Sequence, residues 1–319
     1  MFTILNPGLL STLQDLGRLG HERFGVPVSG AMDEFALRAA NALVLNEPNA
    51  CCLEVLESVE LISSDEALVA VCGFGELHLW VNERLKPTWS ALYLRPGQRL
   101  TLTKAPGGWY YLAVRGGFDV PLVLSSRSTY LRGNFGGHAG RALQTGDVLK
   151  IGAQTSSVIH RPLSLLAGRT LPPAHRPPYS ASPTLQVILG PQLGHFSHVA
   201  LENFLSSEFT VTNASDRMGY RLSGPALTPQ PADILSEGMP LGAIQVPANG
   251  QPLVMMADRP TTGGYPKIAT IIRADVPLLA QCPPGARVRF QPTTVEAAQA
   301  KYKAQLRQLE QISDPITDD

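Results

Sequence analysis

The stretch Gln251–Lys267, QPLVMMADRPTTGGYPK, changes within a few residues from apolar to densely polar. Its apolar part, Leu253–Met256, is short and typical of a buried strand. Glycine and proline then favour a turn, which carries the polar side chains of Asp258, Arg259, Thr261, Thr262, Tyr265 and Lys267. Binding residues concentrate in polar loops of this kind. The stretch therefore predicts a buried strand that ends in a loop belonging to a site.

Two more polar clusters precede this stretch. Ser215–Leu222, SDRMGYRL, places an acid, two arginines and a tyrosine around a glycine. Ser236–Gly250, SEGMPLGAIQVPANG, predicts a strand that carries Gln245 among apolar neighbours. A glutamine in that environment needs hydrogen-bond partners or a ligand. Each cluster alone could be a well-satisfied turn of a barrel, but three clusters within about fifty residues favour a pocket.

The order of these three clusters resembles the C-terminal half of a bacterial family, the C subunits of 5-oxoprolinase. That family is also described as KipA-like, allophanate hydrolase subunit 2-like or biotin-dependent carboxyltransferase-like. The N-terminal half agrees in four segments: STLQDLGRLG at Ser11–Gly20, GVPVSGAMD at Gly25–Asp33, the run from Ala39 to Val55, and AVRGGFDVPLVLSSRSTYLRGNFGG at Ala113–Gly137. The resemblance extends to about Phe290.

The resemblance implies a mainly β fold of two cyclophilin-like β-barrel lobes with a few short helices. Composition agrees, because 29 glycines and 27 prolines with only 16% charged residues favour short strands and tight turns. We expect an N-terminal β-rich lobe at 1–159 and a proline-rich linker or crossover at 160–184. A C-terminal barrel lobe at 185–292 and a terminal helix with a disordered tail at 293–319 follow.

Local signals predict three further features. Asn6-Pro7-Gly8 lies between two apolar runs and predicts an opening hairpin. Asp33 precedes a run with helical spacing and predicts a helix whose first amides it caps. Thr294 predicts the start of an amphipathic helix at 295–312.

Composition excludes several classes of function. Lys plus Arg and Asp plus Glu each total 26, so no overall charge would attract nucleic acid or an anionic membrane. The four cysteines have neither the spacing of a zinc site nor that of a disulfide framework, and we expect buried thiols. No signal peptide or membrane span is apparent, so we expect a soluble cytoplasmic protein.

Several residues of the N-terminal half have two interpretations. Arg18 could pair with Asp15 or contact an anionic ligand. Asp33 could be a helix cap or a catalytic group, and Glu54, inside an apolar run, could be a general base or an anchor for Arg18. The glycine-rich segment Arg132–Arg141 could cradle a phosphate, although it lacks the ending of a P-loop, and His138 within it could be a plain loop residue.

The family resemblance implies one component of an ATP-dependent 5-oxoprolinase, which opens 5-oxo-L-proline to L-glutamate with ATP and Mg²⁺. Its implied partners are a KipI-like protein and a LamB/YcsF-like protein. No biotin-attachment stretch is present in this chain. Catalytic candidates are Asp258, Lys267, Asp33 and Glu54. Substrate-binding candidates are Arg18, Arg217, Tyr220, Gln245, Thr262, Gly264 and Tyr265. Two alternatives remain: a KipA-type regulator that binds a KipI-like kinase inhibitor, and a carboxyltransferase acting on a urea-like substrate.

Overall fold

The computed structural model describes residues 1–75, 77–104, 108–153 and 162–313. Contacts divide the chain into two units, each discontinuous in sequence. Unit 1 contains 1–18, 33–177 and 306–319, and unit 2 contains 19–32 and 178–305. The expected lobes are each continuous in sequence, and their boundaries stay a prediction. Most of the expected tail, 314–319, lies outside the described residues.

Unit 1 consists of two antiparallel sheets. The six-stranded sheet has the order β11-β1-β4-β9-β6-β7, with β1 Phe2–Asn6, β4 Ser58–Ser63, β6 Leu77–Val81, β7 Arg84–Lys86, β9 Arg99–Lys104 and β11 Val148–Leu149. The five-stranded sheet has the order β2-β3-β10-β5-β8, with β2 Leu10–Gln14, β3 Cys52–Leu56, β5 Ala67–Gly73, β8 Ala91–Leu94 and β10 Trp109–Val114. Both sheets contribute to one apolar core, which includes Ile4, Leu13, Leu61 and Leu112.

The predicted opening hairpin is wrong. Strand β1 pairs with β4 and β11, whereas β2 pairs with β3 in the other sheet. Gly8, with a φ of 65°, donates its N–H to the side chain of Asn6, so the turn forms as expected. The strands on either side of the turn diverge because Ile4 and Leu13 then cover the same core from two different sheets.

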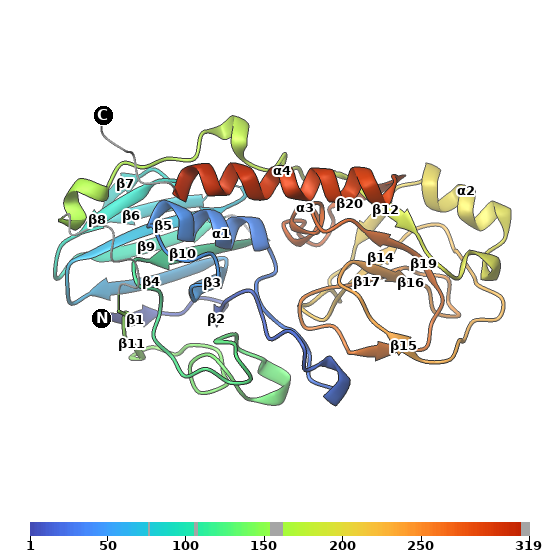
Figure 1. The fold of residues 1–319 in the computed structure, drawn as a ribbon, viewed down its shortest axis with the longest axis horizontal. Helices are drawn as coiled ribbons and strands as arrows, with labels where there is room; N and C mark the ends of the chain where they lie inside the picture. The colour runs from blue at the N-terminus through green and yellow to red at the C-terminus, as the bar shows by residue number, and fades with distance from the viewer. Residues whose placement is uncertain (76, 105–107, 154–161, 314–319) are drawn as a thin grey trace. The chain divides into compact units, whose positions relative to one another are not determined.

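Helix α1, Glu34–Leu43, covers the five-stranded sheet by contacts with β5 and β10 (Figure 1). Its cap is Asp33, whose side chain accepts a hydrogen bond from the N–H of Ala36 at 2.9 Å, so the predicted cap is confirmed. Five short 3₁₀ helices also occur among the described residues: η1 Glu22–Phe24, η2 Leu131–Gly133, η3 Leu163–Leu166, η4 Pro173–His175 and η5 Leu193–His195.

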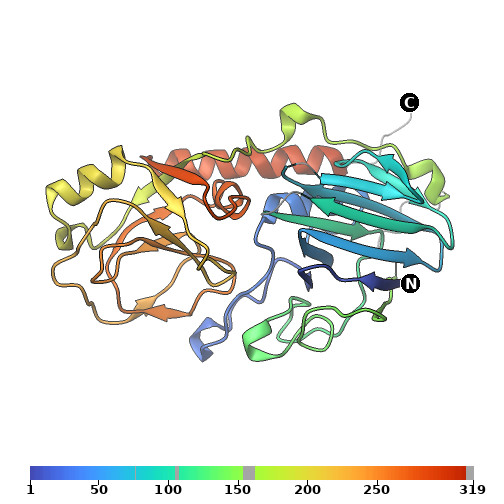
Figure 2. The same ribbon diagram turned by 180° about the vertical axis from the view of Figure 1, so that it is seen from behind.

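Unit 2 contains a closed barrel (Figure 2). Its strand order is β12-β19-β16-β17-β14-β13-β20. Its strands are β12 Thr184–Leu189, β13 Phe209–Val211, β14 Gly219–Ser223, β16 Ala243–Gln245, β17 Leu253–Met255, β19 Lys267–Ile271 and β20 Arg287–Pro292. The parallel pair of β12 and β20 closes it. The strands predicted around Gln245 and Leu253 are confirmed as β16 and β17, and so is the mainly β fold with few helices.

Smaller elements complete unit 2. A two-stranded ribbon pairs β15, Glu237–Gly238, with β18, Thr262–Gly263. Helix α2, His198–Ser206, packs on the barrel through Phe204, whose ring stacks on that of Phe290 at 4.6 Å between centroids. Helix α3, Val276–Ala280, follows β19.

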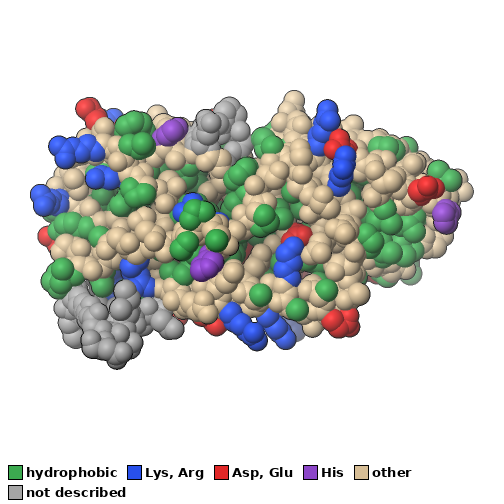
Figure 3. All heavy atoms as spheres, turned by 90° about the horizontal axis from the view of Figure 1, so that it is seen from above, with side chains coloured by type: hydrophobic (Ala, Val, Ile, Leu, Met, Phe, Trp, Pro, Cys, Tyr) green, Lys and Arg blue, Asp and Glu red, His purple; other side chains and the backbone are tan. Residues whose placement is uncertain are grey.

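The predicted terminal helix is confirmed as α4, Val295–Ser313, with the side chain of Thr294 accepting the N–H of Ala297. Within unit 2, Lys301 of α4 donates to the buried Asp275 at 2.6 Å. Among the described residues, none of the helices combines the length and hydropathy that crossing a bilayer requires. Basic and acidic side chains are dispersed among neutral ones on the face in Figure 3.

Candidate functional site

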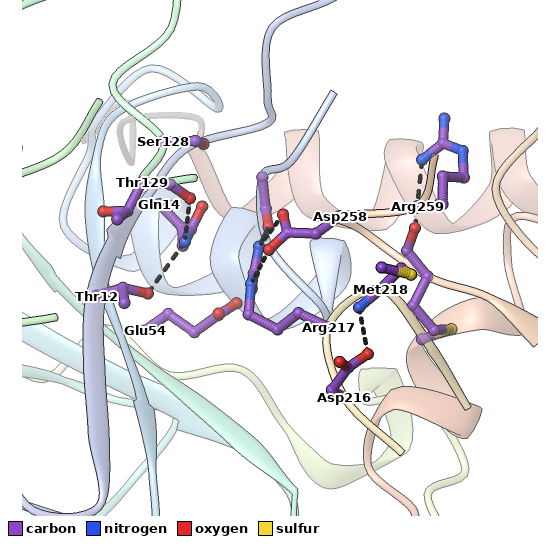
Figure 4. A network of polar contacts seen from close by, with 12 residues as sticks. Thr12, Gln14, Glu54, Ser128, Thr129, Asp216, Arg217, Met218, Asp258 and Arg259 are labelled. Atoms are coloured by element: carbon purple, nitrogen blue, oxygen red, sulfur yellow. Dashed lines mark hydrogen bonds and ion pairs between the residues drawn. The ribbon is translucent and has the colours of Figure 1, made fainter. Parts of the chain in front are cut away.

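In unit 2, the antiparallel pairing of β14 with β17 brings two of the predicted polar clusters together. Beyond the paired strands, the N–H of Asp258 donates to the carbonyl of Arg217 at 2.8 Å. The two side chains then form a bidentate ion pair, with Nε at 3.0 Å and Nη2 at 3.1 Å from the two carboxylate oxygens (Figure 4). Both side chains are buried, at 6% and 8% exposure. The carboxylate of Asp258 is thus held by a fixed cation.

The loop 19–32 supplies a third member of this group. Nη2 of Arg217 also donates to the carbonyl of Gly30 at 2.7 Å. Gly30 has a φ of 87°, a conformation that glycine adopts without strain. The preceding residue, Ser29, adopts a φ of 57° although it has a Cβ, and it is buried. The guanidinium of Arg217 therefore holds a backbone turn in which two successive residues have a positive φ.

Lys267 lies at the start of β19 and is also buried and paired. Its ammonium donates to the carboxylate of Glu237, which accepts a second hydrogen bond from Gln192 at 2.8 Å. The hydrogen bond and charge of Lys267 hold the pKa of Glu237 below its usual range. Gln192 also accepts the backbone N–H of Lys267 at 3.2 Å. Lys267 is thus a buried cation with a half-exposed acidic partner.

The other predicted residues of unit 2 differ in burial and in hydrogen bonding. Gln245 is buried, and its amide donates to the carbonyl of Tyr265 at 3.1 Å, while the tyrosine side chain is 41% exposed. Thr262 is exposed on β18, and the carbonyl of Gly264 accepts from Ile234. Tyr220 is buried, and its hydroxyl donates to the carbonyl of Ala280 in α3 at 2.9 Å.

In unit 1, Tyr111 links two of the predicted catalytic residues. Its hydroxyl donates to the carboxylate of Glu54 at 2.6 Å and accepts the backbone N–H of Asp33 at 2.7 Å. All three residues are fully buried. Burial, together with the carboxylates of Glu54 and Asp33, raises the pKa of Tyr111 well above its usual range. The phenol therefore stays protonated and orients Glu54.

Arg18 is fully buried at the end of unit 1's first segment. Its guanidinium donates to the carbonyl of Ser128 and lies over the ring of Phe135, 4.8 Å from the centroid. The neighbouring carboxylate of Asp15 accepts from the hydroxyls of Ser126 and Ser128 and from two backbone amides. Both side chains organise the loop that precedes the glycine-rich segment.

The glycine-rich segment Arg132–Arg141 is held by an ion pair at its end. Arg141 makes two hydrogen bonds of 2.8 Å to Asp147, and Nε2 of His138 lies 3.3 Å from the same carboxylate. Two of the glycines use their amides within the chain, because Gly137 donates to Arg127 and Gly140 to Gly136. Phosphate binding by this segment stays a prediction.

Four residues that contact or adjoin the predicted site residues were not predicted from the sequence. Tyr111 lies in a run of large apolar residues that predicts only a strand, and Glu237 and Gln192 lie far from Lys267 in sequence. For Ser29, the sequence offers only the neighbouring Gly30, which indicates a turn. The predicted buried thiols are confirmed for all four cysteines. In the described part of the chain, no group of three or more His, Cys, Asp or Glu side chains could hold a metal ion.

The carboxyltransferase domain family, subdomains A and B, matches residues 24–292, and the chain belongs to this family. The chain is 37% identical over 324 aligned residues to the C subunit of 5-oxoprolinase from Escherichia coli, with 98% of each chain covered. It is 36% identical to the C subunit of 5-oxoprolinase from Haemophilus influenzae, with 96% of each chain covered. The crystal structure of Kluyveromyces lactis urea amidolyase is similar with a TM-score of 0.89 and 30% identity, covering 98% of this chain and 20% of the larger one.

The buried ion pair of unit 2 generates a prediction. Asp258→Asn leaves the Arg217 charge buried without its carboxylate, and we expect a loss of about 3–5 kcal/mol in the free energy of unfolding. Adding Arg217→Met removes that charge and restores part of the stability. If the pair belongs to the site, turnover of the assembled enzyme falls on the order of a hundredfold or more in both variants. Urea unfolding and activity measured on both variants check this, and wild-type turnover in the double variant would remove Asp258 from the site.

The end of the glycine-rich segment generates a pH prediction. The hydrogen bonds of Arg141 lower the pKa of Asp147 from 3.8 to about 2. A depressed pKa stabilises the fold above about pH 4, and this contribution disappears as pH falls toward about 2. It amounts to roughly 2 kcal/mol, at about 1.4 kcal/mol per pKa unit. Unfolding of wild type and Asp147→Asn between pH 2 and pH 7 should converge at the acid end, and a constant difference would contradict the assignment.

Proposed function

We propose that this chain is the C subunit of an ATP-dependent 5-oxoprolinase. The observation that carries the proposal is the identity of 36–37% to two 5-oxoprolinase C subunits over 96–98% of each chain. Similarity that runs from end to end includes the loops as well as the barrel strands. It therefore supports a shared site as well as a shared fold.

The chemistry of the reaction fits a protein that acts with partners. 5-Oxo-L-proline is a lactam, and resonance makes its carbonyl a poor electrophile. Transfer of the γ-phosphoryl group of ATP to the carbonyl oxygen activates that carbon, and water then attacks it. The ring C–N bond breaks and leaves an acyl phosphate of glutamate, and a second water hydrolyses it to L-glutamate and phosphate. We assign ATP and Mg²⁺ to the complex with the KipI-like and LamB/YcsF-like proteins.

Within this chain, Glu54 is our candidate for the group that accepts a proton from the attacking water. It is fully buried and oriented by the hydroxyl of Tyr111 at 2.6 Å, which suits a general base held in one rotamer. In unit 2, Lys267 is our candidate for binding an anionic group. Its half-exposed partner Glu237 can move aside more easily than the buried lysine.

Carboxyl transfer to a urea-like substrate is the second candidate function. The structural similarity to urea amidolyase of Kluyveromyces lactis, with a TM-score of 0.89, favours it. The identity of 30% is lower than that to the two 5-oxoprolinase proteins, and the match covers 20% of the larger protein. Such chemistry would require carboxybiotin carried by another protein.

The test is reconstitution. We expect this chain alone to release no glutamate from 5-oxo-L-proline and ATP, because the lactam must be activated by partners. Mixing it with both proposed partners, each purified from the same organism, should produce glutamate and phosphate in equal amounts. Each pairwise combination serves as a control. Full turnover by this chain alone would contradict the multi-subunit assignment, and urea-dependent consumption of carboxybiotin without glutamate formation would favour the second candidate.

A further inference from the structure

Gln14 is a fully buried amide at the end of β2. Its Nε2 donates two hydrogen bonds, to the hydroxyl of Thr12 at 3.0 Å and to the backbone carbonyl of Thr129 at 3.2 Å (Figure 4). An amide nitrogen carries two protons, so these bonds use its full donor capacity.

The orientation of this amide is fixed by its partners. The carbonyl of Thr129 can only accept, so the nitrogen of Gln14 must face it. The opposite assignment would place two carbonyl oxygens in contact. The remaining atom, Oε1, is buried and has no hydrogen-bond partner among the described residues. An acceptor in this position is costly unless something donates to it.

The neighbours of Gln14 place this acceptor on a polar sheet face. Thr12 and Gln14 alternate with Leu13, which belongs to the apolar core, so they project from the opposite face. Thr12 lies directly across from Glu54, and Glu54 lies across from Tyr111. The side chains of these four polar residues are at most 1% exposed. One face of the five-stranded sheet therefore carries both the candidate base and an acceptor of fixed direction.

We propose that Oε1 of Gln14 accepts the ring N–H of the substrate and selects for an amide. This inference rests on the proposed function. A lactam presents one donor, its N–H, beside the carbonyl that reacts, and a site that binds it needs an acceptor for that proton. The corresponding lactone has a ring oxygen instead of the N–H and would bring two acceptors together.

The experiment compares two ligands and three proteins. Calorimetry on the assembled complex without ATP measures the affinity for 5-oxo-L-proline and for the lactone 5-oxotetrahydrofuran-2-carboxylate. The proteins are wild type, Gln14→Met, which keeps chain length but has no amide oxygen, and Gln144→Met. Gln144 is an exposed loop residue and gives a matched control for the substitution.

We expect wild type and the Gln144 variant to bind the lactam about 10- to 100-fold more tightly than the lactone, as the loss of one buried hydrogen bond predicts. Gln14→Met should lose that preference while its affinity for the lactone changes little. Equal affinity of the wild type for the lactam and the lactone would overturn the inference. A Gln14→Met variant that still prefers the lactam would also overturn it. Failure of wild type to bind the lactam at all would instead refute the proposed function on which the inference rests.

Discussion

The hydroxyl of Tyr111 joins the carboxylate of Glu54 to the backbone that begins α1. A carboxylate that is fully removed from water requires hydrogen bonds to its charged form. Tyr111 provides one from the neighbouring strand and at the same time satisfies the N–H of Asp33. This single phenol therefore orients Glu54 and links it to Asp33, the residue that caps α1.

Unit 2 satisfies its buried charges by the same principle. Arg217 is matched by Asp258 and by the carbonyl of Gly30, and Lys267 is matched by Glu237. Such pairs add little net stability compared with apolar residues of similar size, because removing both charges from water is costly. Arg217, Asp258 and Lys267 therefore stay candidates for binding or chemistry rather than established site residues.

Features encoded locally could be predicted from the sequence. The strands at Leu253 and Gln245, the cap at Asp33 and the terminal helix depend on residues a few positions apart. Contacts between distant positions could not be predicted, because Tyr111 and Glu54 are 57 residues apart and meet only through strand register. The failed hairpin has the same cause. Asn6-Pro7-Gly8 specifies a turn, but only the shared core decides that β1 and β2 enter different sheets.

We propose that the polar face around Glu54 carries the chemistry. Glu54→Gln keeps an oxygen that can accept from Tyr111 but removes the basic carboxylate. In the assembled complex, the account predicts near-wild-type thermal unfolding and a rate of glutamate formation lowered on the order of a hundredfold or more. A variant that folds normally and releases glutamate at the wild-type rate would contradict it.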